Sequence, residues 1–81
     1  MPEVMVADGY RFWIHEYYES PPQVLVERSG TWCIVAIGDE DQAPEVIIEG
    51  DMRRTQAGRA AWIVYHSQEI LLAHWRRLHA P

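Results

Sequence analysis

Short apolar or aromatic runs, separated by turn residues, fill the first half of the chain. Runs of this length that are rich in aromatic and β-branched residues are typical of β-strands. Alternation along the second run puts Phe12 and Ile14 on one face of a strand, and Arg11 and Trp13 on the other. The predicted strands span residues 4–6, 10–15, 23–28, 31–37 and 45–49.

The link between the third and fourth runs carries the most definite local signal. Ser29 and Gly30 join the two runs, and a short link that contains Gly predicts a hairpin in which Gly30 takes a positive φ. Pro21 and Pro22 cannot donate to a sheet ladder, so they separate the second run from the third. These signals predict a small antiparallel sheet of four to five strands.

The period of the apolar positions changes in the last thirty or so residues. Apolar residues from Ala57 to Leu78 recur near helical spacing, and Asp51 is a predicted N-cap. Gly58 and residues 66–67 interrupt the pattern, so the segment is one helix or two, with Ser67 capping the second.

Length and pattern together predict one α+β domain over residues 1–81, strand-rich over 1–50 and helical over 51–81. The C-terminal helix or helix pair is expected to cover the sheet. A chain this short buries only about 60% of the surface that its unfolded form exposes, so the core is thin. The predicted core aromatics are Phe12, Trp32 and Trp75.

Cysteine content and the N-terminus bear on the compartment. Cys33 is the one cysteine, so no intramolecular disulfide can form. The first residues lack the basic and apolar regions of a signal peptide, and no apolar run is long enough to cross a bilayer. We therefore predict a cytoplasmic protein. Cys33 lies within an apolar run, which favours a buried structural thiol over a nucleophile.

The net charge of −5 is unevenly distributed. Residues 1–51 hold most of the acids, whereas residues 52–81 hold five Arg and one acid. An acidic body disfavours nonspecific nucleic-acid binding, whose affinity comes mainly from neutralised phosphates. The basic C-terminal segment leaves nucleic-acid binding as an alternative. The residues that would carry it are Arg53, Arg54, Arg76 and Arg77.

The acids concentrate between the fourth and fifth predicted strands and around the fifth. They are Asp39, Glu40, Asp41, Glu45 and Glu49. Their spacing does not fit a calcium-binding loop, because Gly50 stands where the bidentate Glu belongs. Two interpretations remain: a solvated loop that keeps the protein soluble, or an anionic patch that docks a basic partner, in the extreme by phosphate mimicry.

Aromatic residues in the helical segment provide a second candidate surface. Trp62 and Tyr65 lie three apart, and Arg59 stands one turn before Trp62. Trp, Tyr and Arg dominate interface hot spots. The trio is therefore either part of a partner-binding surface or a cover for the sheet edge.

No catalytic or metal-binding pattern is complete. The four His do not share a helical face with the spacing of a zinc site, so no metal and no cofactor is expected. An enzyme with a diverged site remains the alternative from another class. It would use His15, Glu19 and His66.

Several short motifs resemble a known family. They are Met1-Pro2, residues 8–12, Pro21-Pro22 followed by Val24 and Val26, and residues 63–75. The chain resembles the small bacterial proteins called the domain of unknown function 4160 family. That family typically carries a His-x-Pro-Pro-His-x-His run. Here Glu19, Gln23 and Leu25 stand at the three His positions, so any chemistry of those imidazoles is missing.

The resemblance implies a small-protein partner, because the family is often encoded beside a second small protein in toxin–antitoxin-like pairs. We therefore expect a nonenzymatic protein-binding module of bacterial or phage origin, with a toxin–antitoxin-type or a host-defence-inhibiting role. The partner could be a basic nucleic-acid-binding protein or complex, and an exposed hairpin edge would also permit dimerisation.

Overall fold

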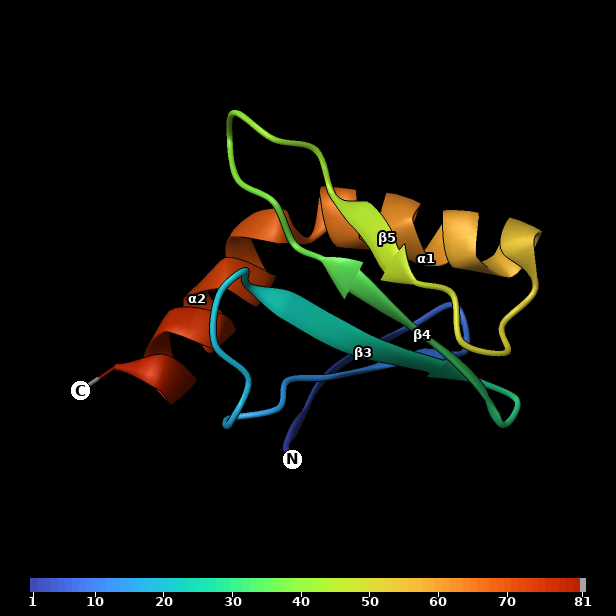
Figure 1. The fold of residues 1–81 in the computed structure, drawn as a ribbon, viewed down its shortest axis with the longest axis horizontal. Coiled ribbons are helices and arrows are strands. Elements are labelled where there is room, and N and C mark those ends of the chain that lie inside the picture. Colours follow the sequence, from blue (N-terminus) through green and yellow to red (C-terminus); the bar gives the residue numbers. More distant parts are fainter. Residues whose placement is uncertain (81) are drawn as a thin grey trace.

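Five antiparallel strands followed by two helices make up residues 1–80, the part of the chain that this computed structural model describes (Figure 1). The predicted α+β class, with a C-terminal helix pair, is confirmed. The elements are β1 (Glu3–Ala7), β2 (Tyr10–Trp13), β3 (Gln23–Arg28), β4 (Thr31–Ala36), β5 (Glu45–Ile48), α1 (Arg54–His66) and α2 (Gln68–His79). Within residues 1–80, no helix has the length and apolar character needed to span a membrane.

The strands pair in sequence order, β1-β2-β3-β4-β5, so the sheet is a meander. The predicted β3–β4 hairpin is confirmed, with φ of 51° at Ser29 and 80° at Gly30. The β1–β2 turn repeats this conformation at Asp8 and Gly9. Two successive positive φ values match the right-handed twist of the flanking strands. Arg28 Nη1 donates to the Asp8 carbonyl oxygen at 2.6 Å and so connects the two turns.

The helices cover one face of the sheet, and α1 lies behind β5 in Figure 1. Alternate strand residues point toward the helices and form the core together with apolar helix residues. From the strands and the residues directly after β2 and β4, the fully buried side chains are Phe12, Ile14, Val24, Val26, Cys33, Val35 and Ile37. From the helices, the buried side chains include Ala57, Ala60, Ile63, Val64, Leu71 and Trp75.

The prediction that Trp32 lies in the core is wrong. Phe12 and Trp75 are buried as expected, but Trp32 is 38% exposed. Cys33 and Val35 of β4 face the helices, so alternation turns Trp32 and Ile34 to the opposite face. An apolar run that continues through β4 does not reveal which of its two faces the helices will cover.

The predicted N-cap of α1 is also wrong. α1 begins one residue after Arg53, and Asp51 Oδ1 instead accepts the backbone N–H of Trp32 at 2.8 Å. The Met52 N–H donates to the Trp32 carbonyl oxygen at 3.2 Å, so the turn after β5 stays attached to β4. The predicted helix break is confirmed at Ser67, which occupies the N-cap position of α2 without a side-chain hydrogen bond.

Gly50 makes this turn possible. Its φ is 60°, and an added Cβ would lie 2.3 Å from the Trp32 carbonyl oxygen. We expect Gly50→Ala to lower the free energy of unfolding by about 1–3 kcal/mol, because alanine is strained there and meets backbone. Gly58→Ala is the matched control: no atom lies within 4 Å of the added Cβ, and the same change inside α1 should stabilise by about 0.5–1 kcal/mol. Urea denaturation measures both changes. A Gly50→Ala protein as stable as wild type would contradict this role.

Candidate functional site

The face of the sheet that points away from the helices carries an apolar row. Strand register places Trp13 opposite Leu25, Leu25 opposite Ile34, and Ile34 opposite Ile48, so the row crosses β2, β3, β4 and β5. We call these four residues the open-face row. Trp32 lies on the same face, two positions before Ile34 on β4.

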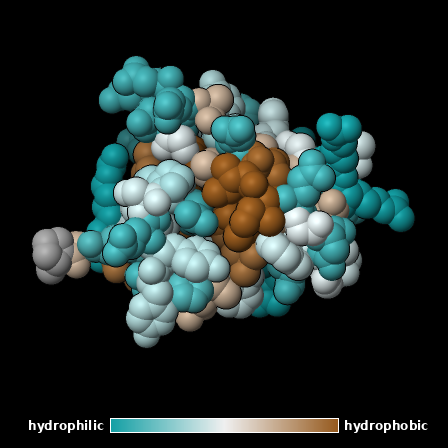
Figure 2. Space-filling view, viewed as in Figure 1, coloured by the Kyte–Doolittle hydropathy of each residue, from teal (hydrophilic) through white to brown (hydrophobic). Residues whose placement is uncertain are grey.

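Exposure separates this row from the core. Ile48 is 48% exposed, Trp13 and Leu25 are half-buried, and Ile34, in the middle of the row, is buried. Figure 2 shows a hydrophobic patch near the middle of this face, where β3, β4 and β5 run in Figure 1, with polar residues around it. The uncovered face of an antiparallel sheet is commonly polar. Large exposed apolar patches with a polar rim are typical of interaction sites, so this face is the candidate surface.

The charges around the open-face row are mainly negative. Arg11 binds Glu3, with its Nε 2.8 Å from Glu3 Oε2, and its Cζ lies 5.2 Å from the Trp13 ring centre. The Arg11 charge is thus offset by Glu3. Glu27 lies opposite Trp32, and Glu45 lies opposite Ala36. Neither forms an ion pair within residues 1–80, although Arg11 lies opposite Glu27 in the strand register.

The predicted acidic group divides into two parts. Glu45 begins β5 and Glu49 follows its last residue, and both are exposed. Asp39 holds the preceding loop together, because its Oδ1 accepts the N–H groups of Asp41 and Gln42 at 2.8 and 2.9 Å. One oxygen of Asp39 therefore has a structural role that the sequence did not indicate.

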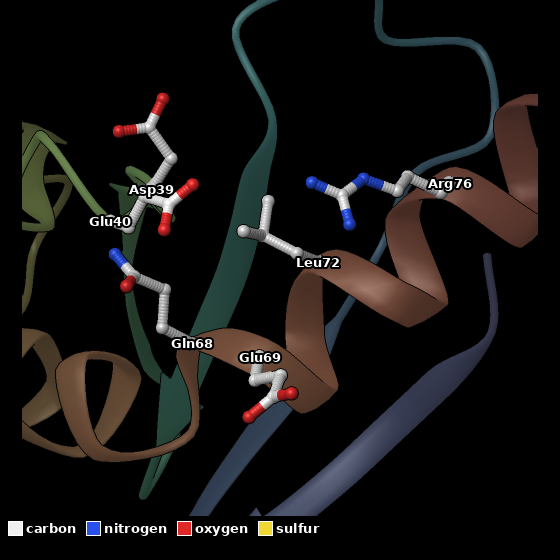
Figure 3. A pocket seen from close by; sticks show the side chains of 6 residues that line it. All are labelled: Asp39, Glu40, Gln68, Glu69, Leu72 and Arg76. Carbon is white, nitrogen blue, oxygen red and sulfur yellow. The ribbon is translucent and has the colours of Figure 1, made fainter.

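A cleft of about 410 Å³ separates this loop from α2 (Figure 3). Gln68 anchors the loop to α2, since its Nε2 donates to the Ile37 carbonyl oxygen at 2.9 Å. In Figure 3, Arg76 reaches toward Leu72 from one side, Asp39 and Glu40 lie on the other, and Glu69 points away. The cleft combines opposite charges around one apolar side chain and brings together no nucleophile and base.

The aromatic trio of α1 lies on a different surface. Trp62 and Tyr65 are half exposed, whereas Ala60, Ile63 and Val64 of the same helix face the sheet. Arg59 Nη2 contacts Asp8 Oδ2 at 2.7 Å, and Arg59 Cζ lies 4.3 Å from the Trp62 ring centre.

The structure therefore does not bring the predicted partner-binding residues into one site. Trp62 and Tyr65 are exposed on α1, whereas Asp39 and Glu40 line the cleft beside α2. Glu45 and Glu49 stand at the two ends of β5.

The residues of the enzyme alternative are dispersed. The His15 ring stacks on Tyr18 with ring centres 4.4 Å apart, whereas the His66 ring packs on Trp62 at 4.2 Å. Glu19 lines another cavity, with Ser20, Trp75 and His79. Of the three main cavities within residues 1–80, two are lined by none of these three residues and one by Glu19 alone. In the same residues, no three His, Cys, Asp or Glu side chains are grouped so that they could hold a metal ion.

The four Arg of the nucleic-acid alternative lie at the two ends of the helical layer. Arg53 and Arg54 stand at the start of α1, and Arg76 and Arg77 lie in the last turn of α2, near the opposite end of the molecule in Figure 1. Arg76 also shares its cleft with three acidic residues, Asp39, Glu40 and Glu69. This arrangement does not form one continuous basic patch.

Burial raises the pKa of the Cys33 thiol from 9.0 to about 11. The folded protein therefore keeps the thiol proton between these values, while the unfolded chain loses it. Because the folded state then binds more protons, the free energy of unfolding should fall as pH rises from 9.0 toward about 11. Urea denaturation of wild type and Cys33→Val isolates this component. Parallel pH profiles for the two proteins would show that Cys33 does not contribute.

The open-face row was not among the residues predicted from the sequence. Its signal was present in residues 32–37, where no polar residue interrupts the run. A strand covered on one side only is expected to alternate, so a continuous apolar run indicates that both faces are apolar.

Comparison of the chain with protein-family models, with curated proteins and with solved structures gives no match.

Proposed function

We propose that this chain is a nonenzymatic protein-binding module whose binding surface is the open face of the sheet. The open-face row carries the proposal: four apolar side chains, one from each of four adjacent strands, form a contiguous row on the face opposite the helices, and Ile48 at its end is 48% exposed. Trp13 and Trp32 add the large aromatic surface that interface hot spots favour.

The partner is a protein that presents an apolar surface surrounded by Arg or Lys. Glu27 and Glu45 flank the row without an ion pair in residues 1–80, and the whole chain carries a net charge of −5. Complementary charges around an apolar contact speed association and select the partner. A second copy of this chain fits less well, because it would bring the same carboxylates onto this face.

The biological role that we propose is membership of a toxin–antitoxin-type pair or inhibition of a host-defence complex, in a bacterium or phage. The sequence resemblance supports a small-protein partner. The lack of convergence among His15, Glu19 and His66 favours binding over the enzyme alternative.

Affinity capture from the source cell tests the proposal when it compares two matched double variants. Leu25→Ser/Ile48→Ser alters the open-face row, and Trp62→Ser/Tyr65→Ser alters the outward side of α1. We expect wild type and the α1 variant to capture the same stoichiometric protein, and the open-face variant to lose it. Capture that survives in the open-face variant and is lost in the α1 variant would contradict the proposal.

A further inference from the structure

β5 forms one edge of the sheet, and its outer side pairs with no strand within residues 1–80. It is four residues long, and only Val46 of its side chains is half-buried. Ile48 is the last member of the open-face row. The edge of β5 is therefore continuous with the proposed binding surface, and an edge strand offers unpaired N–H and C=O groups to another chain.

The charges around the two edge strands differ. β1 begins with Glu3 and is followed by Asp8, and each carboxylate is neutralised within the protein, by Arg11 and Arg59 respectively. β5 has the same arrangement of terminal acids, in Glu45 and Glu49. Within residues 1–80, neither of these two forms an ion pair. Of the two edges, β5 is thus the one with uncompensated negative charge at both ends.

Self-pairing of β5 is disfavoured by the same charges. Two copies paired antiparallel about Ile47 would place Glu45 of one copy opposite Glu49 of the other, and like charges directly opposite each other destabilise a strand pair. The register shift between Ile34 and Val35, opposite Val46 to Ile48, distorts the edge further. Short length, a bulge and charged ends all protect an edge strand from indiscriminate pairing with other chains. A strand that pairs with β5 must therefore offset the charges of Glu45 and Glu49.

We propose that β5 takes up an extended segment of the partner protein as an additional strand, with Lys or Arg beside Glu45 and Glu49 and an apolar residue beside Ile48. This inference rests on the proposed function and specifies how the partner binds. Main-chain hydrogen bonds to an exposed sheet edge supply affinity, and the alternate side chains of the added strand supply specificity. The apolar residue extends the open-face row by one strand.

A Lys-Val peptide of about eight residues, a typical strand length, with Lys at both ends and Val between them, is a direct probe. Its Glu-Val counterpart is the control. On titration into the ¹⁵N-labelled full chain, we expect the Lys-Val peptide to shift the amide signals of residues 45–48 and to slow their hydrogen exchange, because outward N–H groups of an edge strand become bonded. Glu45→Lys/Glu49→Lys should weaken this binding about tenfold. The matched variant Glu16→Lys/Glu19→Lys, which changes two exposed acids of the β2–β3 loop, should not.

Each other outcome overturns the inference. No binding of the Lys-Val peptide, equal binding of the Glu-Val peptide, or slowed exchange at β1 in place of β5 contradicts strand addition at this edge. Shifts confined to the open-face row, without slowed exchange in β5, also contradict it but leave the proposed function standing. The proposed function fails separately, when the open-face double variant still captures the partner.

Discussion

Replacing Phe12 by alanine is expected to lower the free energy of unfolding by about 3–5 kcal/mol, since the change removes a buried ring and leaves a cavity. Phe12 is fully buried on β2, where it lies between Met5 of β1 and Val26 of β3. Small domains have a free energy of unfolding of only about 5–15 kcal/mol, so this loss removes a large part of the stability.

Urea denaturation followed by circular dichroism measures the effect of Phe12→Ala. Ile70→Ala is the control, because Ile70 is 59% exposed on α2 and surface changes of this kind stay within about 0.5 kcal/mol of wild type. If the two variants were equally stable, Phe12 would not lie in the principal core.

Reversing the charges beside the open-face row is expected to slow association with the partner about tenfold or more at low salt. Glu27→Lys/Glu45→Lys replaces the two carboxylates that lie on this face without an ion pair in residues 1–80. A basic partner would then meet repulsion where it met attraction.

Stopped-flow or surface-binding kinetics with the captured protein measure this effect. Added salt should slow the wild type toward the rate of the variant, since ions screen exposed charges beyond about 10 Å at 0.1 M. Glu16→Lys/Glu19→Lys changes the net charge by the same amount, but at two acids of the β2–β3 loop. This variant should retain most of the wild-type association rate. Equal slowing by both variants would show that the net charge of the whole protein sets the association rate. The carboxylates of the open face would then have no specific effect on that rate.

Local chemistry made much of the fold predictable. Gly30 requires no neighbour to adopt a positive φ, and the Pro pair ends a strand whatever the rest of the chain does. Ser67 marked the break between the helices, although its side chain makes no capping bond. Asp51 shows the limit of such reasoning: its carboxylate binds the Trp32 N–H, a partner nineteen residues away in the chain.

The site was less predictable, because it depends on which face of the sheet the helices cover. Trp32 was expected in the core on its apolar character, yet alternation along β4 puts it on the open face. The acids around β5 and the trio of α1 were predicted as two candidate surfaces, and neither prediction included Leu25, Ile34 or Ile48. Leu25 and Ile48 became candidates only once the register placed them in a row with Ile34.

The most direct test of binding at the open face is an amide chemical-shift map of the ¹⁵N-labelled protein titrated with the captured partner. We predict the largest changes at Trp13, Leu25, Ile34 and Ile48, with little change at Trp62 and Tyr65. A map centred on the outward side of α1, with the open-face row unchanged, would contradict the claim that this protein works through the uncovered face of its sheet.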